Sequence, residues 1–244
     1  MVIRRWPVAA AAVVTMALAA GCGGPGGGTA GGSGVSAAPA AASASPRVSA
    51  PPAMPALSKQ VAAALRSATS THVFADVRRG SRHVVMDASM SRSGGLSGQL
   101  RINNVPLTFL VTRGSAYIKI TAAFLRYTHL PSAACASVCG KWVKTSAGNA
   151  SGITGGLGWS SLVSPSTHRL PRLSYQGPAT VNGQPAWKLR SNRGSVAYVA
   201  AAGRPYPLRL TQGGNRIDFT RWNHAAIPPP PPPGQVVSPG RLGG

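Results

Sequence analysis

The sequence predicts an α+β fold: a curved antiparallel β-sheet of about ten strands, forming an open half-barrel, with a few helices on its concave side. Three observations predict it. Apolar and polar residues alternate in a series of short segments, and Gly or Asn residues separate many of these segments. One segment with helical spacing precedes the series, and one irregular stretch interrupts it. Short alternating segments joined by tight turns favour consecutive antiparallel hairpins.

The N-terminus is laid out as an export signal. Arg4 and Arg5 form a positive head, and Pro7–Ala20 follows without a charge. This run holds about 14 residues, whereas a membrane-spanning helix needs about 20. We therefore expect a cleaved signal peptide rather than a transmembrane helix.

Small residues then lead into Cys22, and this ending resembles a bacterial lipoprotein signal. The resemblance implies that Cys22 is acylated, with palmitate among its chains, and becomes the first residue of the mature protein. The protein would then be lipid-anchored to the cell membrane on its extracytoplasmic face. Such signals prefer Leu three residues before the Cys, where this chain has Ala19. The alternative is an ordinary secreted protein cleaved near Gly21, in which Cys22 is incidental.

Residues 23–55 consist mostly of Gly, Ala, Ser and Pro, with Arg47 as their only charge. Such a segment lacks the large apolar side chains that offset chain entropy, so we expect a flexible tether with a mean reach of about 30 Å. The predicted organisation has four parts: a lipoprotein signal peptide (1–21), the lipidated Cys with its tether (22–55), one folded domain (56–226) and a Pro-rich disordered tail (227–244).

Within the folded domain, Leu57–Ala68 has apolar residues at three- and four-residue spacing, which predicts an amphipathic helix. Two more helical segments are expected in the irregular middle, at 121–128 and 159–163. The predicted strands are 71–79, 83–92, 96–103, 105–113, 115–120, 141–145, 173–181, 183–191, 195–201, 205–212 and 215–222.

The charge of the chain is extreme. There are 25 Lys and Arg residues against three acids, Asp76, Asp87 and Asp218, giving a formal charge of +22. Removing Arg4 and Arg5 with the signal leaves +20. An exported protein meets little nucleic acid, so a nucleic-acid partner is not expected despite this charge. Anionic lipid head groups, an acidic glycolipid or an anionic envelope polymer are candidate partners, and a solvated surface without a specific partner is an equal alternative. The abundance of Arg, Ala and Gly points to a GC-rich, actinobacterial genome.

Cys135 and Cys139 form an even pair in an exported domain, which predicts a disulfide. The bond would pin a loop before the next strand. The alternative is a metal or redox site. However, zinc requires four ligands and only His129 lies nearby, while a thioredoxin-like motif has two intervening residues instead of three.

Three stretches carry a family resemblance. "ALRSATSTHVFADVRRGSRHVVMDASMS", "AYIKI…KWVKT" and "YPLRLTQGGNRIDFTRWNHAAIPPPP" resemble actinobacterial lipoproteins of the LppX/LprG type, over roughly residues 57–228. The resemblance implies a LolA-like fold, an open half-barrel whose hollow is closed by helices and can hold acyl chains. Some members of that family carry lipids or lipoglycans, and for others no ligand is established.

The sequence contains no recognisable catalytic constellation. The three acids fall on three different predicted strands, no G-x-S-x-G motif is present, and the glycine-rich "GGLGWSS" lacks the ending of a phosphate-binding loop. We therefore expect no enzyme activity, no metal and no cofactor. His72 has the best claim to a role among the histidines, because it lies in the family-like Ser-x-His-Val context. A structural hydrogen bond is the simpler interpretation of that residue.

Apolar side chains on the concave side of the sheet are the remaining candidates for a ligand-binding site. A cavity for acyl chains would be lined by Met86, Met90, Leu107, Phe109, Val111, Ile118, Leu189 and Tyr198. The sequence thus predicts a monomeric, membrane-anchored lipoprotein that binds or carries a lipid or other amphiphile. The alternative is an envelope interaction or scaffold lipoprotein of the same fold, with a filled core.

Overall fold

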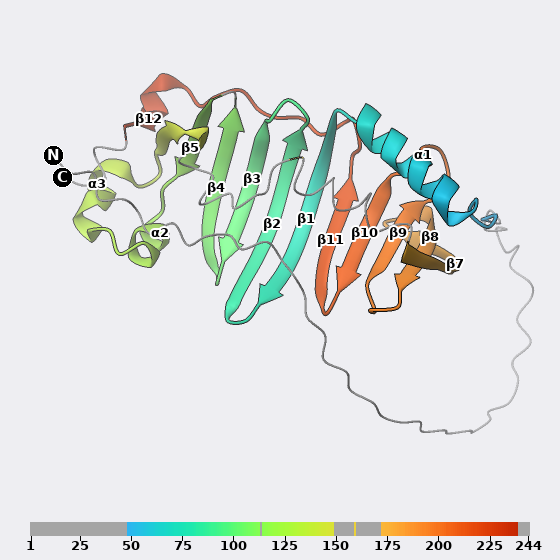
Figure 1. Cartoon of the computed structure of the whole chain (residues 1–244). Helices are drawn as coiled ribbons and strands as arrows, with labels where there is room; N and C mark the ends of the chain where they lie inside the picture. Colours follow the sequence, from blue (N-terminus) through green and yellow to red (C-terminus); the bar gives the residue numbers. More distant parts are fainter. Residues whose placement is uncertain (1–47, 113, 149–158, 160–171, 239–244) are drawn as a thin grey trace, which may run out of the picture.

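A single sheet of twelve strands organises the chain (Figure 1). The computed structural model describes residues 48–112, 114–148, 159 and 172–238. Along the sheet the strands follow the order β12-β6-β5-β4-β3-β2-β1-β11-β10-β9-β8-β7. Every pairing is antiparallel except that of β12 with β6. The strands are β1 (Ser70–Arg79), β2 (Arg82–Ser91), β3 (Leu96–Ile102), β4 (Val105–Thr112), β5 (Ser115–Lys119), β6 (Trp142–Ser146), β7 (Leu173–Val181), β8 (Gln184–Ser191), β9 (Val196–Ala200), β10 (Pro207–Gln212), β11 (Asn215–Thr220) and β12 (Val236–Val237).

The sheet consists of two series of strands in which consecutive strands pair antiparallel. β1 to β6 form one series, β7 to β11 form the other, and β1 joins them by pairing with β11, with His72 opposite Thr220. The predicted curved antiparallel sheet with few helices is confirmed. The tight turns follow from local chemistry, since Asn103 and Asn104 both take positive φ (47° and 69°) between β3 and β4. Two such residues give the turn whose twist matches a hairpin.

The main helix, α1 (Met54–Ser67), runs along the β8–β11 half of the sheet (Figure 1). It starts three residues before the predicted position. Its apolar side chains Leu57, Val61, Ala64 and Leu65 are buried. They belong to one core cluster with the apolar residues of the sheet's inner face. Spacing of three and four residues places them on one side of the helix, which is why this side packs on the sheet.

Arg92, in the turn between β2 and β3, binds the end of α1. Its guanidinium donates from Nε to the Ala68 carbonyl (2.9 Å) and from Nη2 to the Leu65 carbonyl (2.6 Å). The last carbonyls of a helix lack partners within the helix and carry its negative end, so a cation here is stabilising. The N-terminal end is also fixed, because Trp187 on β8 donates from Nε1 to the Ser49 carbonyl (2.8 Å).

Short helices lie at the opposite end of the sheet, near β5 and β6 (Figure 1). They are α2 (Ala122–Tyr127), η1 (Ser132–Ala134) and α3 (Cys135–Val138). α2 falls within the predicted helix 121–128, and the Thr121 hydroxyl caps it by accepting from the Phe124 amide (3.1 Å). Of the predicted helical segment 159–163, only Trp159 belongs to the described residues.

The Pro-rich segment after β11 is described as far as Ser238. This part of the predicted tail 227–244 contains η3 (Pro233–Gln235) and β12, so the disorder expected for the tail does not apply to these residues. It runs across the ends of the strands, past the turn between β2 and β3, and then adds β12 alongside β6 (Figure 1). Val237 is buried there, opposite Val143. This strand could not be predicted from the sequence, because it has only two paired residues and follows a run of prolines.

The other edge strand, β7, is irregular. The register of β7 against β8 shifts between Tyr175 and Pro178. Gly177 sits at that shift with φ +111°, a conformation that side-chain-bearing residues rarely adopt. The sheet therefore ends at β7 in a bulged, proline-containing strand, and at the other side in the two-residue β12.

Candidate functional site

Seven of the eight residues predicted to line a cavity lie together on the inner face of the sheet. Met86, Met90, Leu107, Phe109, Ile118 and Leu189 are each at most 7% exposed and belong to the same core cluster, and the half-buried Val111 packs against it. Cross-strand register explains the grouping, since Leu100 faces both Met86 and Leu107, and Phe109 faces Ile118. Strict alternation along each strand puts them all on one side.

Tyr198 is the exception and corrects the prediction for that residue. It pairs with Lys188, whereas its neighbour Ala197 pairs with the inner-face Leu189. Tyr198 therefore projects from the outer face, where it packs against a second small cluster: Val181, Ala186, Ala200 and Leu208. The inner-face alternation in β9 is carried by Ala197 and Val199 instead.

The inner face is wider than α1. Twelve strands at about 4.8 Å spacing give a sheet about 53 Å across. A helix of 14 residues is about 21 Å long, so α1 alone spans less than half of that width. The apolar inner residues nevertheless continue from Phe219 on β11, under α1, to Val143 on β6. The face is therefore one continuous apolar surface that α1 covers only in part.

Aromatic side chains gather where β11 ends. Trp222 stacks on Tyr206 (ring centroids 4.7 Å apart) and on Phe219 (5.7 Å), and Trp159 meets it edge-on at 6.2 Å. The buried Trp222 donates from Nε1 to the Pro207 carbonyl (3.0 Å). Arg92 lies over the Trp159 ring, 5.6 Å from its centroid. Trp222 is thus a core anchor, and the site it organises is structural.

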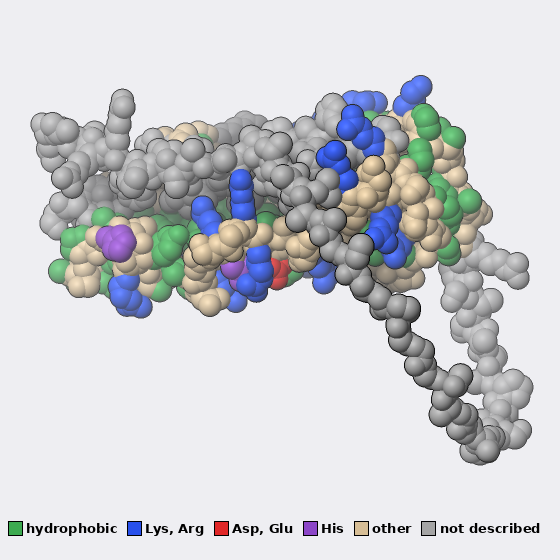
Figure 2. Space-filling model, turned by 60° about the horizontal axis from the view of Figure 1, so that its bottom comes forward, with side chains coloured by type: hydrophobic (Ala, Val, Ile, Leu, Met, Phe, Trp, Pro, Cys, Tyr) green, Lys and Arg blue, Asp and Glu red, His purple; other side chains and the backbone are tan. Residues whose placement is uncertain are grey.

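All three acids of the chain lie on the outer face of adjacent strands, and each is bound by a basic side chain. His83 Nε2 lies 2.8 Å from Asp76 Oδ1, and His72 Nε2 lies 2.8 Å from Asp87 Oδ1. Figure 2 shows a face of the molecule on which an acidic side chain lies beside a histidine, with Lys and Arg side chains around them. The structural interpretation of His72 is the one that the geometry supports.

Asp218 is the buried member of the three, with its side chain 6% exposed. Arg209 donates to it from Nε (2.5 Å) and Nη2 (3.2 Å), and Arg216 donates from Nε (2.8 Å) and Nη2. Burial alone would raise the pKa of Asp218, but the hydrogen bonds and charges of the two arginines outweigh it and hold the pKa below its usual value. The same carboxylate raises the pKa of Arg216.

A hollow of ≈ 340 Å³ opens on the outer face beside the His72–Asp87 pair. Its side-chain walls lie in two neighbouring cross-strand rows: His72, Ser89 and Ser97 in one, Asp87 and Gln99 in the other. Arg221, just beyond the end of β11, completes the wall, and Ala88 and Gly98 line the floor. The hollow exists because two short serine side chains face each other where longer side chains surround them. Sequence reasoning missed this hollow.

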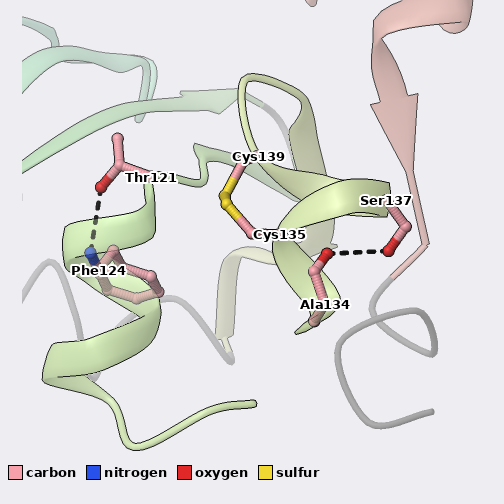
Figure 3. The surroundings of a disulfide bond; sticks show 6 residues. All are labelled: Thr121, Phe124, Ala134, Cys135, Ser137 and Cys139. Atoms are coloured by element: carbon pink, nitrogen blue, oxygen red, sulfur yellow. Dashed lines mark hydrogen bonds between the residues drawn. A yellow bond between two sulfur atoms is a disulfide. The ribbon is translucent and has the colours of Figure 1, made fainter. Parts of the chain in front are cut away.

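The Cys135–Cys139 disulfide is present (Figure 3). It links the start of α3 to the residue after it, with Cα atoms 4.7 Å apart. Both sulfurs are therefore committed to a structural bond. Among the described residues, no three His, Cys, Asp or Glu side chains are grouped as a metal site would require.

The signal peptide and Cys22 lie outside the described residues. Within the described part of the chain, no helix is long and apolar enough to cross a membrane.

Comparison with known proteins shows the fold. No family model matches the chain, and no curated protein matches its sequence. The solved structure of LprF from Mycobacterium bovis superposes with a TM-score of 0.53 at 17% identity, over 72% of this chain and 96% of LprF. The lipoprotein LppX of Mycobacterium tuberculosis aligns over 70% of this chain and 97% of its own, at 17% identity and a TM-score of 0.45. The chain thus has the fold of LprF, and the resemblance to LppX/LprG-type lipoproteins is confirmed at the level of the fold.

Proposed function

We propose that this chain is a membrane-anchored lipoprotein that binds or carries a lipid or other amphiphile outside the cytoplasmic membrane. One observation carries the proposal: the apolar inner face is about 53 Å wide, and α1 spans about 21 Å of it. The inner side chains Met86, Leu107 and Phe109 are at most 2% exposed, so they already have apolar cover within the chain. Acyl chains would take the place of part of that cover and contact these side chains, which keeps the apolar surface away from water.

The anchor and the tether place this face near its source of ligand. Acylation at Cys22 would contribute about 0.8 kcal/mol for each buried CH₂, so two or three chains hold the protein at the membrane. The segment after Cys22 is long enough for the domain to leave the surface and return to it. The proposal includes no catalysis, because the sequence contains no recognisable catalytic motif.

The scaffold alternative retains one observation in its favour. Six of the predicted cavity residues are at most 7% exposed, as in a filled core. The two functions differ in whether an amphiphile is bound, and this difference can be measured.

The test is mass spectrometry of organic extracts of the Cys22→Ala chain, exported from an actinobacterial host. A stoichiometric amphiphile supports the carrier and identifies its class. A folded, monodisperse protein that yields an empty extract supports the scaffold instead. Wild-type protein should be found in the membrane fraction and be labelled by a palmitate analogue, whereas the Cys22→Ala chain should be found in the medium and remain unlabelled. Unchanged membrane retention would contradict the anchor.

A further inference from the structure

The hollow on the outer face has a composition unlike that of the inner face. All six of its wall residues are polar: His72, Asp87, Ser89, Ser97, Gln99 and Arg221. It also lies on the opposite side of the sheet from the proposed lipid-binding face, because these strand residues alternate with inner-face residues such as Met86 and Leu100. A volume of ≈ 340 Å³ falls at the lower end of the range for small-molecule sites.

Most of the hydrogen-bonding capacity in the hollow is unused. Within the part of the chain that the structure describes, the side chains of Ser89, Ser97, Gln99 and Arg221 make no hydrogen bond or ion pair. Asp87 uses Oδ1 to hold His72, and its side chain is 62% exposed, which leaves Oδ2 open to a ligand. His72 is oriented from both sides, by Asp87 at Nε2 and by the Thr220 hydroxyl at Nδ1 (3.4 Å).

The arrangement of charge limits the class of ligand. A carboxylate oxygen and a guanidinium face the same small volume. An anion would therefore be repelled by Asp87, and a cation would be repelled by Arg221. The two serine hydroxyls and the Gln99 amide can each both donate and accept. This mixture suits a neutral ligand whose groups also donate and accept, and the hydroxyl groups of a sugar have this property.

The backbone at Arg221 supports the same interpretation. Arg221 takes φ +49°, in the left-handed region where residues with side chains are uncommon. The turn that follows is closed by a hydrogen bond from the His224 amide to the Arg221 carbonyl (2.9 Å). Such a conformation costs of order 1–3 kcal/mol and tends to persist at functional sites. Here it places at the rim of the hollow a guanidinium that has no partner among the described residues.

We propose that this outer-face hollow binds a neutral sugar unit, held by Arg221, Gln99, the two serines and the free oxygen of Asp87. The site is independent of the proposed lipid binding, because none of its polar side chains lies on the inner face. A polysaccharide and the head group of a glycolipid are the two sources of such a unit; the chemistry they share is a set of sugar hydroxyl groups.

Amide NMR shifts of the Cys22→Ala chain test this proposal. The probes are D-glucose, D-mannose, D-galactose and D-arabinose. Titration with at least one should shift the amides around Ser89, Ser97 and Gln99 in a saturable manner. Phosphatidylcholine vesicles with and without a glucosyl diacylglycerol distinguish the two sources. If binding to vesicles requires the glycolipid, the bound sugar is the head group of a glycolipid. If the free sugar saturates the site and the vesicles do not bind, the bound sugar comes from a polysaccharide.

Two variants make the result specific. Arg221→Gly removes the guanidinium at a position whose φ favours glycine, so it should retain or raise stability while weakening binding about tenfold. Arg190→Gln removes an equal charge from the exposed surface of β8 and should leave binding unchanged. The proposal is overturned if no sugar and no glycolipid shifts these amides, if Arg221→Gly binds as well as Arg190→Gln, or if inorganic phosphate displaces the sugar. The lipid content of the organic extract is a separate readout, which neither variant should change.

Discussion

Replacing Asp218 by Asn gives a direct test of the electrostatics of the outer face. Asp218 is the most buried charge of the described chain, and two arginines converge on it from β10 and from its own strand. Asn keeps the shape and one acceptor but removes the negative charge. The arginines are then left facing each other across a neutral amide.

The expected loss can be worked out from the exposure of the partners. The Arg209 side chain is 22% exposed, so its hydrogen bonds to the carboxylate should count nearly in full, at about 1.5–3 kcal/mol. The Arg216 side chain is 46% exposed, so solvent screens that pair, which should add less than about 1 kcal/mol. The sum is about 3 kcal/mol, which for a domain of this size corresponds to a fall in Tm of about 6–12 °C.

The pH dependence gives the sharper result. The pKa of Asp218 lies below its usual value in the folded protein. Its unfolded pKa is about 3.9, so its contribution is fully present above about pH 4 and is lost as the pH falls through the folded pKa. Chemical denaturation at neutral pH should therefore separate Asp218→Asn from wild type by about 3 kcal/mol, and the gap should narrow steadily below about pH 4.

The matched control is Asp87→Asn, whose carboxylate is 62% exposed and should cost less than about 1 kcal/mol. The reasoning is refuted if the two variants lose the same stability at neutral pH, or if the Asp218→Asn deficit does not change with pH.

Three further predictions concern packing and cross-links. Gly98→Ala should destabilise the domain by about 1–3 kcal/mol in urea denaturation, because the new Cβ would lie 2.2 Å from the Asp87 carbonyl oxygen; a fully stable variant would show that β2 and β3 can separate freely. Cys139→Ser opens a loop with a sequence separation of only 4, so the thermal melt should show a loss of at most about 2 kcal/mol, and a larger loss would mean that the bond does more than restrict the unfolded chain. Val237→Asp puts a charge into the buried pairing of β12 with β6, and proteolysis should then remove the tail faster than in wild type; equal rates would argue against this pairing.

The strands could be predicted from the sequence because each has a local cause. In β4, Leu107 and Phe109 alternate with Thr108, and in β2 the buried Met86, Ala88 and Met90 stand at every second position. Burial on one face imposes a period of two regardless of what lies beyond the strand. The pairing of β1 with β11 has no such local trace, since residues about 150 positions apart meet there.

The two His–Asp pairs could be predicted from the sequence once the register of the β1–β2 hairpin is known. The turn at Gly80 sets Arg79 opposite Arg82, and this register fixes every later partner along the hairpin. His72 then lies diagonal to Asp87, and Asp76 lies in the same diagonal relation to His83. Diagonal neighbours on one face of a hairpin are close enough for such side chains to touch. Alternation along each strand does not give these partners, because they depend on the register between the two strands.

The prediction for Tyr198 failed for a related reason. The stretch Val196–Ala200 is apolar at every position, so alternation cannot tell its inner residues from its outer ones. Only the pairing of Ala197 with Leu189 settles which face each residue takes. The hollow at Ser89 and Ser97 was missed because it depends on three strands and on Arg221, which come together only in the fold.

The two ends of the sheet have a consequence for how the molecules behave toward one another. A strand with free backbone groups at the edge of a sheet is a template on which another chain can add a strand. Here one edge is a bulged strand with Pro178, which cannot donate a hydrogen bond, and the other is the two-residue β12, which follows a proline run. Molecules tethered side by side on a membrane would be crowded in two dimensions, where open edges readily propagate into fibres. The bulge and Pro178 at one limit, and the two-residue β12 after its proline run at the other, would hinder such edge-to-edge growth at high surface density.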